Sequence, residues 1–325
     1  MKFFPLRIIA MIVTVFMLAL FAAGGANTEP FDVLEPESCV LNLTVFSDVH
    51  VESNNYPRYR VCANSLRNAA QNKSGSDAFL FLGDSTMNGQ NIENMIFHGT
   101  VTRLLKDQKF ISVPGNHDFG NGEGDFKAIQ QRWYTYTEAF FGKKLTTPYY
   151  YEVVNGFYFI VLANEIQDIN CMYMSDDQYA WLELMLEDAA RSGLPTFVLA
   201  HYPPRMSKPL NPDTEYDLCR MLAAYNREHD LFYLCGHLHS GPGSTTFHSW
   251  SGFPETYLPC LTRLTETGKI DENSGFGEIV EVYADRVVFR MRNFYTGEWG
   301  GVNGAPMEAT YTLKNPIPAA AMNGE

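Results

Sequence analysis

Short polar motifs with carboxylate, amide and imidazole side chains recur along this chain, each directly after an apolar run. In chain order they are Asp48-Val49-His50, Gly83-Asp84, Gly115-Asn116-His117-Asp118, His201 and Gly236-His237-Leu238-His239. Such oxygen and nitrogen ligands bind divalent cations such as manganese, iron and zinc. Two cations side by side supply the concentrated positive charge that hydrolysis of a phosphate ester requires. The motifs therefore predict a metal site suited to phosphate ester chemistry.

The apolar runs before the motifs have the length of buried strands, and segments with helical spacing separate them. The sequence predicts strands over residues 40–46, 78–82, 110–113, 196–200 and 231–234, and helices over 60–71, 92–106, 126–141, 176–191 and 218–228. Strands that alternate with helices in this way pair in parallel, and the helices cover the sheet. A side chain just beyond the carboxyl end of such a strand projects into a crevice.

Two later stretches predict antiparallel hairpins instead. Turns at Asn155-Gly156 and Ala284-Asp285 separate the paired runs 149–154 with 157–163 and 277–283 with 287–293. An Asn-Gly pair between apolar runs is the strongest short hairpin signal. The last residues, 315–325, predict a loose tail.

The spacing within two motifs predicts how the ligands are aimed. Asp48 and His50 are two residues apart, and the histidines of the Gly236 motif repeat this spacing. On an extended segment, side chains two residues apart face the same way. Gly83 and Gly236 directly precede ligands, where a missing side chain lets the backbone turn sharply or approach a ligand closely.

The order and spacing of the five motifs resemble the calcineurin-like metallophosphoesterase superfamily, over about residues 40–295. The resemblance implies a four-layer α/β/β/α sandwich with two mixed β-sheets, whereas periodicity alone indicates only an α/β layer. It also implies that a metal-bridging hydroxide attacks phosphate esters of small molecules. A phosphodiesterase is slightly favoured, and a phosphomonoesterase is the alternative. A catalytically silent binding protein on the same fold is the remaining alternative, but such members generally lose ligands.

The resemblance further implies two divalent metal ions, with Mn, Fe and Zn equally suited to the ligands. One ion takes Asp48, His50, Asp84 and His239, and the other takes Asp84, Asn116, His201 and His237, so that Asp84 bridges them.

The same resemblance implies roles for residues beside the metal ligands. His117 contacts the phosphate together with Asn116 and protonates the leaving group, and Asp118 orients the imidazole of His117. Arg205 follows His201 closely, and its position alone predicts contact with a phosphate oxygen. Purple acid phosphatases carry a tyrosine ligand where this chain has Met87, which argues against a ferric tyrosinate site.

Three histidines and three aromatic residues outside the motifs are predicted to have structural rather than chemical roles. We predict that His98, His229 and His248 lie on the surface or in loops, because no other ligand type accompanies them. Trp133, Tyr134 and Tyr136 could stack on a nucleobase, but their helical spacing favours a place in the core.

The residues at the two ends of the chain predict a signal peptide and an extension on each side of the main domain. Lys2 and Arg7, an uncharged run over 8–23 and small residues at 24–26 are typical of a signal peptide over residues 1–26. The protein is then exported (secreted, periplasmic or at the cell surface), with an uncleaved membrane anchor as the alternative. We further expect an N-terminal extension over 27–39, the phosphoesterase domain over 40–295, and a C-terminal extension with the tail over 296–325.

Charge and cysteine content limit the partners. Residues 1–26 hold two basic and no acidic residues, so their removal changes the net charge from −13 to −15. Such a surface repels a nucleic-acid duplex but not a small phosphate ester drawn to metal ions. The six cysteines allow disulfides and equally allow buried thiols. The sequence predicts no stable membrane partner after signal cleavage. It does not indicate which oligomeric state the protein adopts.

Overall fold

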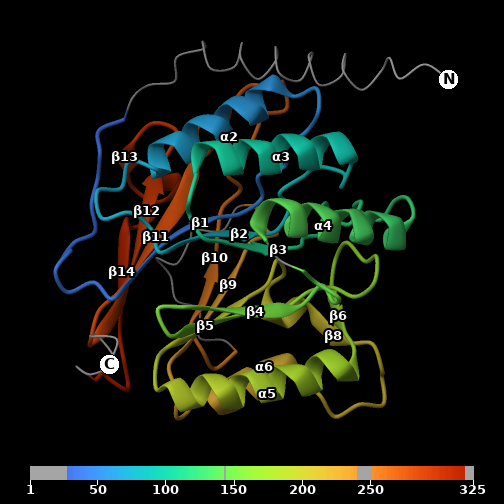
Figure 1. The fold of residues 1–325 in the computed structure, drawn as a ribbon, viewed down its shortest axis with the longest axis vertical. Coiled ribbons are helices and arrows are strands. Elements are labelled where there is room, and N and C mark those ends of the chain that lie inside the picture. The colour runs from blue at the N-terminus through green and yellow to red at the C-terminus, as the bar shows by residue number, and fades with distance from the viewer. Residues whose placement is uncertain (1–27, 143, 240–250, 319–325) are drawn as a thin grey trace.

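Two β-sheets lie face to face, and helices cover the outer face of each (Figure 1). The computed structural model describes residues 28–142, 144–239 and 251–318. Its layers are helix, sheet, sheet and helix, which confirms the four-layer arrangement that the resemblance implied. The predicted signal peptide lies outside the described residues, and none of the described helices is long and apolar enough to cross a membrane.

The first sheet holds the strands that precede the first three motifs. Its strands are β1 (Leu41–Phe46), β2 (Ala78–Leu82), β3 (Phe110–Val113), β11 (Phe276–Val282), β12 (Arg286–Asn293), β13 (Glu298–Trp299) and β14 (Glu308–Thr312). They run in the order β13-β12-β11-β1-β2-β3, and β14 also pairs with β12. β1, β2 and β3 are parallel, so their carboxyl ends meet at one edge. α2 (Tyr56–Ala69) and α3 (Asn91–Leu104) pack on the outer face, and α4 (Phe126–Phe141) lies beside α3.

The second sheet holds the strands that precede the other two motifs. Its strands are β4 (Tyr150–Val154), β5 (Phe157–Val161), β7 (Thr196–Leu199), β9 (Leu231–Cys235) and β10 (Glu255–Tyr257), in the order β10-β9-β7-β5-β4. Only β4 is antiparallel to its neighbour, as the Asn155-Gly156 turn predicts. α5 (Asp176–Ser192) and α6 (Leu218–Tyr225) cover the outer face. A small sheet of β6 (Met172–Met174) and β8 (Ser207–Pro209) lies apart.

The main core lies between the two sheets. Leu80 and Leu82 of the first sheet belong to the same buried cluster as Phe159, Phe197 and Phe232 of the second. The rings of Phe159 and Phe197 stack with centroids 5.1 Å apart. Because helices bury the outer faces as well, the strands are apolar on both sides, which explains their continuous apolar runs.

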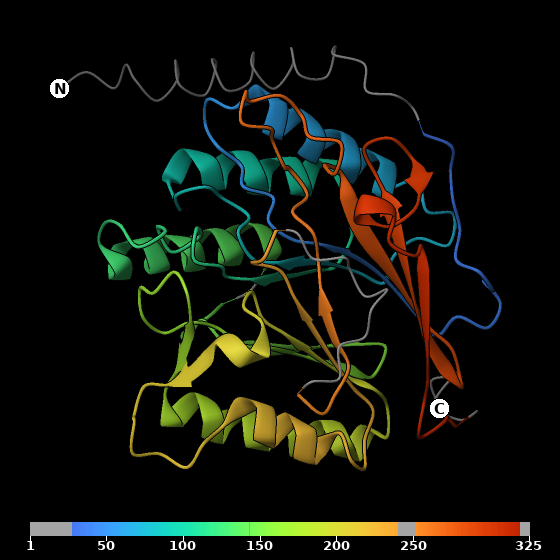
Figure 2. The same cartoon turned by 180° about the vertical axis from the view of Figure 1, so that it is seen from behind.

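The folded region extends further toward the C-terminus than the sequence predicted. β14 pairs with β12 (Figure 2). In this pairing Val288 lies opposite Thr310. Ile317 is only 4% exposed and packs in the main core, and Asn315 donates to Asp230. The prediction of a loose tail is therefore wrong for residues 315–318, and the rest of that tail lies outside the described residues. At the other end, Phe31 packs against Trp299, with ring centroids 5.9 Å apart.

The histidines, aromatic residues and cysteines outside the motifs lie partly where the sequence predicts and partly elsewhere. The surface prediction is wrong for His98, which is buried in α3 and stacks on Tyr136 at 5.5 Å. Burial lowers the pKa of His98 to about 3. His229 is half-buried, and His248 lies outside the described residues. The core prediction is confirmed for Trp133, which is 2% exposed. All six cysteines, each within the described residues, are unpaired thiols.

Candidate metal centre

Every predicted metal ligand follows the carboxyl end of a strand, and both sheets contribute. Asp48 and His50 follow β1, Asp84 follows β2, Asn116 follows β3, His201 follows β7, and His237 and His239 follow β9. Because the two sheets face each other, these strand ends bring the ligands to one place.

Backbone hydrogen bonds continue the strand pairing into the ligand loops. The amide of Asp48 donates to the carbonyl of Gly83 at 3.0 Å, and that of His50 donates to Asp84 at 2.8 Å. In the second sheet, the amide of Gly236 donates to the carbonyl of His201 at 3.0 Å. The loops are therefore fixed to each other, and the ligands sit on rigid backbone.

Five of the seven predicted ligand residues share an uncommon backbone conformation. Asp48, His50, Asp84, His237 and His239 all have positive φ angles, of 52°, 47°, 51°, 69° and 56°. Residues other than glycine rarely adopt this left-handed region, and it concentrates at functional sites. The prediction that pairs of ligands alternate on an extended segment is thus wrong. The strands end before the ligands, and left-handed turns aim the side chains instead.

The two glycines before ligands are confined by close neighbours, as predicted. A Cβ atom at Gly83, whose φ is 92°, would lie 2.5 Å from Nδ1 of His201. A Cβ atom at Gly236 would overlap Oγ of Ser47 and Oδ2 of Asp48. Only glycine therefore lets the backbone come this close to the ligands.

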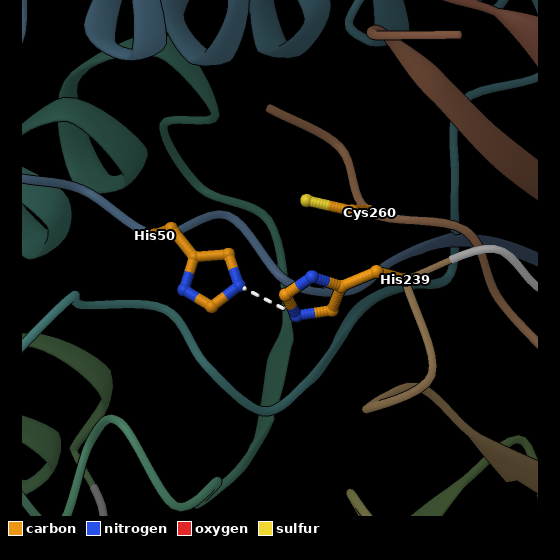
Figure 3. Close-up of side chains that lie close together, drawn as sticks. All are labelled: His50, His239 and Cys260. Carbon is orange, nitrogen blue, oxygen red and sulfur yellow. Dashed lines mark hydrogen bonds between the residues drawn. The ribbon is translucent and has the colours of Figure 1, made fainter. Parts of the chain in front are cut away.

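The first group of ligand atoms belongs to Asp48, His50, Asp84 and His239, and these atoms all lie within 4.8 Å of one another. Nε2 of His239 lies 3.0 Å from Oδ1 of Asp48 and 3.0 Å from Nε2 of His50. Figure 3 shows the two rings pointing toward each other, with Cys260 beside them. The thiol of Cys260 donates to the backbone carbonyl of Asp48 at 3.1 Å, and burial raises its pKa.

A second group joins the first through Asp84. Oδ2 of Asp84 lies 3.1 Å from Nε2 of His201 and 4.0 Å from Nε2 of His50. Nδ1 of His237 lies 3.3 Å from Nε2 of His201 and 3.1 Å from Oδ1 of Asn116. The other ring nitrogen of His201 contacts the carbonyl of Leu82 at 2.8 Å, which leaves Nε2 turned toward the group.

The site fits divalent cations. Oδ1 of Asp48 and Oδ2 of Asp84 are buried and make no hydrogen bond of ordinary geometry. An unsatisfied buried polar atom costs about 1–3 kcal/mol, so atoms left in this state need another partner. Carboxylate oxygens with imidazole nitrogens form the donor set that manganese, iron and zinc prefer.

The protonation states of the site are strongly shifted. Burial alone would raise the pKa of Asp84, but the surrounding histidines, chiefly His201, bring it below its ordinary value. Burial alone would lower the pKa of His201, but Asp84 and Asp48 raise it to about 9. Burial lowers the pKa of His50 to about 3 and that of His237 to about 4. These shifts favour ionised carboxylates and neutral rings at His50 and His237, the states that metal binding requires, whereas His201 would have to release its proton to bind a cation.

Asp118 does not orient His117, contrary to the sequence-based prediction. Its carboxylate accepts hydrogen bonds from the amides of Gly115 (3.0 Å), Ser85 (3.2 Å) and Thr86 (2.9 Å), and from the hydroxyl of Thr86. Burial, with Asp84 nearby, raises the pKa of Asp118 to about 6. Asp118 therefore ties two ligand loops together.

His117 is held by a backbone group that the sequence did not single out. Its Nδ1 contacts the carbonyl of Met87 at 2.6 Å, and its amide donates to Oδ1 of Asp84 at 2.8 Å. Nε2 of His117 lies 4.0 Å from Oδ2 of Asp84, so it faces the ligand group.

Arg205 lies in a different cavity from the metal ligands. Its Nε donates to Ser251 at 3.2 Å, and the cavity it lines holds Tyr179, Tyr216 and Cys219 but no predicted metal ligand. Two other arginines, Arg58 and Arg263, do share a cavity with a ligand, His239. The sequence reasoning missed them because neither belongs to a motif.

Comparisons with known proteins give a family model and similar structures. The model for calcineurin-like phosphoesterases matches residues 41–241. No curated protein matches the sequence at a significant level. A purple acid phosphatase from yellow lupin (Lupinus luteus) seeds has a similar fold, with a TM-score of 0.58 and 14% identity over 87% of this chain. This chain spans about half of the lupin protein, 55%. GAP50, the anchor in the inner membrane complex of Plasmodium, gives a TM-score of 0.49 and 12% identity over 86% of this chain and 89% of its own.

Proposed function

Because the chain belongs to the calcineurin-like phosphoesterase family, we propose that it is a hydrolase of small-molecule phosphate esters that binds two divalent cations. One observation carries the proposal. Buried oxygens of Asp48 and Asp84 that accept no ordinary hydrogen bond lie among histidine nitrogens, in two groups that share Oδ2 of Asp84. A shared carboxylate oxygen between two nitrogen-rich groups is the arrangement that a bridging ligand needs.

The proposed assignment follows the two groups of ligand atoms. Asp48, His50, Asp84 and His239 would hold one ion, and Asp84, Asn116, His201 and His237 would hold the other. When bound, such ions stabilise charge on phosphoryl oxygens and lower the pKa of water.

The neighbouring residues of the chain position the substrate and move a proton in this proposal. His117 is fixed through Nδ1 by the carbonyl of Met87, so Nε2 is left to contact the ester and give a proton to the leaving oxygen. Asn116 is oriented by its amide nitrogen, which donates to Asn121 at 3.0 Å, so Oδ1 turns toward His237 and the site. Asp118 acts as a positioning residue through its bonds to the loops after β2 and β3.

The partner in this proposal is a small phosphate ester. A diester remains the first choice and a monoester the alternative, and both fit the proposed reaction. The net charge of −13 argues against a nucleic-acid duplex as substrate. We also propose export, on the basis of the signal-like sequence at residues 1–26.

Metal analysis combined with ester hydrolysis tests the proposal. We expect about two bound cations per chain when manganese, iron or zinc is supplied, and hydrolysis of a nitrophenyl monoester, a bis-nitrophenyl diester, or both. Chelation should remove both the metal and the activity, and added metal should restore them. Metal-replete protein that hydrolyses neither ester would contradict the enzyme assignment, and a single ion per chain would contradict the dinuclear one.

The identity of residue 87 leads to a spectroscopic prediction. Iron-loaded protein should lack an intense visible charge-transfer band, because a methionine stands where a tyrosinate would bind ferric iron. Met87 contributes backbone groups instead: its amide donates to Val51 at 3.0 Å and its carbonyl contacts His117. The absorption spectrum of concentrated iron-loaded protein, with manganese-loaded protein as the blank, is the measurement. A purple colour would show that the prediction is wrong.

A further inference from the structure

A cavity of about 370 Å³ opens beside the candidate metal centre, and its lining is cationic. Its walls are formed by Arg58, Leu238, His239, Cys260, Arg263 and Leu264. His239 connects it to the metal ligands, since its side chain is 45% exposed while those of Asp48 and His50 are buried. A molecule whose phosphate lies at the ligand atoms can therefore extend past His239 into this cavity.

Arg58 is linked through Thr262 to the loop that carries two of the metal ligands. Its Nη1 donates to the backbone carbonyl of Thr262 at 3.0 Å and to the Thr262 hydroxyl at 3.2 Å. That hydroxyl in turn donates to the carbonyl of Val49 at 2.6 Å, between Asp48 and His50. The Nε of Arg58 is buried without a hydrogen bond. Arg58 thus holds a fixed place relative to the ligands, and the bonds to Thr262 use only Nη1 of its guanidinium.

Arg263 supplies a second positive charge to the same cavity. Its Nε lies 3.9 Å from Oδ1 of Asp271, which is a long separation for an ion pair, and the side chain is 40% exposed. The backbone beneath it is better fixed, because the carbonyl of Arg263 accepts from the amide of Asp271 at 3.1 Å and from the hydroxyl of Ser274. Among the described residues, no carboxylate lies within 4.0 Å of the Arg58 guanidinium, and only this distant one approaches Arg263.

The described part of this chain, whose net charge is −13, gives Arg58 no ion pair and Arg263 only the long one to Asp271. Arginine presents a planar fork of donors that matches carboxylate and phosphate groups. Leu238 and Leu264 add apolar surface to the lining of the same cavity, which suits a short carbon skeleton.

We propose that this cavity is a specificity subsite, and that the substrates are phosphate esters carrying a second anionic group, a carboxylate or a further phosphate, which Arg58 and Arg263 bind. This inference rests on the proposed function, because the first phosphate is taken to lie at the metal ions. It goes further by naming a substrate class and the residues that select it.

Binding of unreactive phosphonates to the metal-loaded protein tests the subsite without turnover. The probes are carboxyalkylphosphonates with one to four methylenes, α,ω-bisphosphonates of the same lengths, and matched alkylphosphonates with no second anion. For the best length, we expect the second anion to lower Kd by at least about 10-fold, as charge-assisted bonds to arginine do. Comparison of the carboxylate and phosphonate probes identifies the preferred anion.

Substitution of the arginines decides whether they cause the preference. Arg58→Gln and Arg263→Gln should each reduce it to below about 3-fold and leave Kd for the alkylphosphonate within about 2-fold. Because Arg58 also holds Thr262, Arg263→Gln is the variant that keeps the test valid if Arg58→Gln disturbs the loop. Arg227→Gln, at an exposed position near α6, is the matched control and should change nothing.

The possible failures can be told apart. If alkylphosphonates bind but no second anion improves binding, or if the preference survives both substitutions, the subsite is wrong and the proposed function stands. Equal weakening of all probes by both variants would also contradict it, because the arginines would then hold the first phosphonate. If no phosphonate binds the metal-loaded protein, the proposed function fails and this inference with it.

Discussion

Asp84→Asn is expected to abolish hydrolysis and to lower the bound metal, while the protein stays folded. Oδ2 of Asp84 lies between the two ligand groups, 3.1 Å from His201 and 4.0 Å from His50. An amide keeps the size of the carboxylate but removes the charge that a bridging ligand supplies. Loss of a group that merely supports a ligand costs about 10–100-fold in affinity or activity, so loss of a shared ligand should cost at least ~10³-fold in kcat/KM.

The measurements are kcat/KM, metal content and circular dichroism, each made on the variant and the wild type. Asp107→Asn is the matched control, because Asp107 is exposed and also has a positive φ, of 63°. It should retain full activity and metal. The bridging assignment would be wrong if Asp84→Asn kept wild-type turnover, or if it lost activity with both ions still bound.

The elements around the site were largely predictable, because local signals mark them. The prediction of a helix over 126–141 matches α4, whose ends are set by Asp125, which accepts from the amides of Lys127 and Ala128, and by Gly142 with φ of 68°. α2 begins earlier than predicted, since Asn55 caps it and Pro57 occupies its first turn. β14 was missed because its residues alternate between exposed and half-buried, so they carry little apolar pattern.

The candidate ligands could be found from sequence, but not the way in which they are aimed. The motifs identify Asp48 and His50, yet nothing in residue type requires a left-handed turn at either position. Adjacency in the sequence also gave the wrong partner for Asp118, whose carboxylate accepts from Thr86 and does not bond to His117. Contacts between distant segments leave no local pattern.

The arginines beside the site illustrate the same limit. Arg58 comes from the first turn of α2, and Arg263 comes from the loop after β10. They line one cavity because Thr262, next to Arg263, bonds both to Arg58 and to Val49 in the loop after β1. Arg205, which is close to a ligand in sequence, is directed to Ser251 instead.

His117→Asn is expected to separate proton transfer from metal binding. The sequence predicted that Asp118 orients the ring of His117. In the structure the carbonyl of Met87, 2.6 Å from Nδ1, fixes the ring instead. A carbonyl oxygen can only accept, so Nδ1 carries the proton in the neutral ring and Nε2 is the atom that faces Asp84 and the site. His117 can therefore deliver a proton from Nε2 after a second proton is taken up there.

A general acid contributes about 10²–10⁴-fold, and most where the leaving group is poor. His117→Asn should therefore slow alkyl phosphate esters by about that factor and nitrophenyl esters by less than ~10-fold, with metal content unchanged. His201→Asn should instead lose metal, and His229→Asn, at a half-buried position away from the ligands, should match the wild type. Equal losses on both ester types would contradict the acid role. Loss of an ion from His117→Asn would mean that the ring, whose Nε2 lies 4.0 Å from Oδ2 of Asp84, acts on the metal ligands instead.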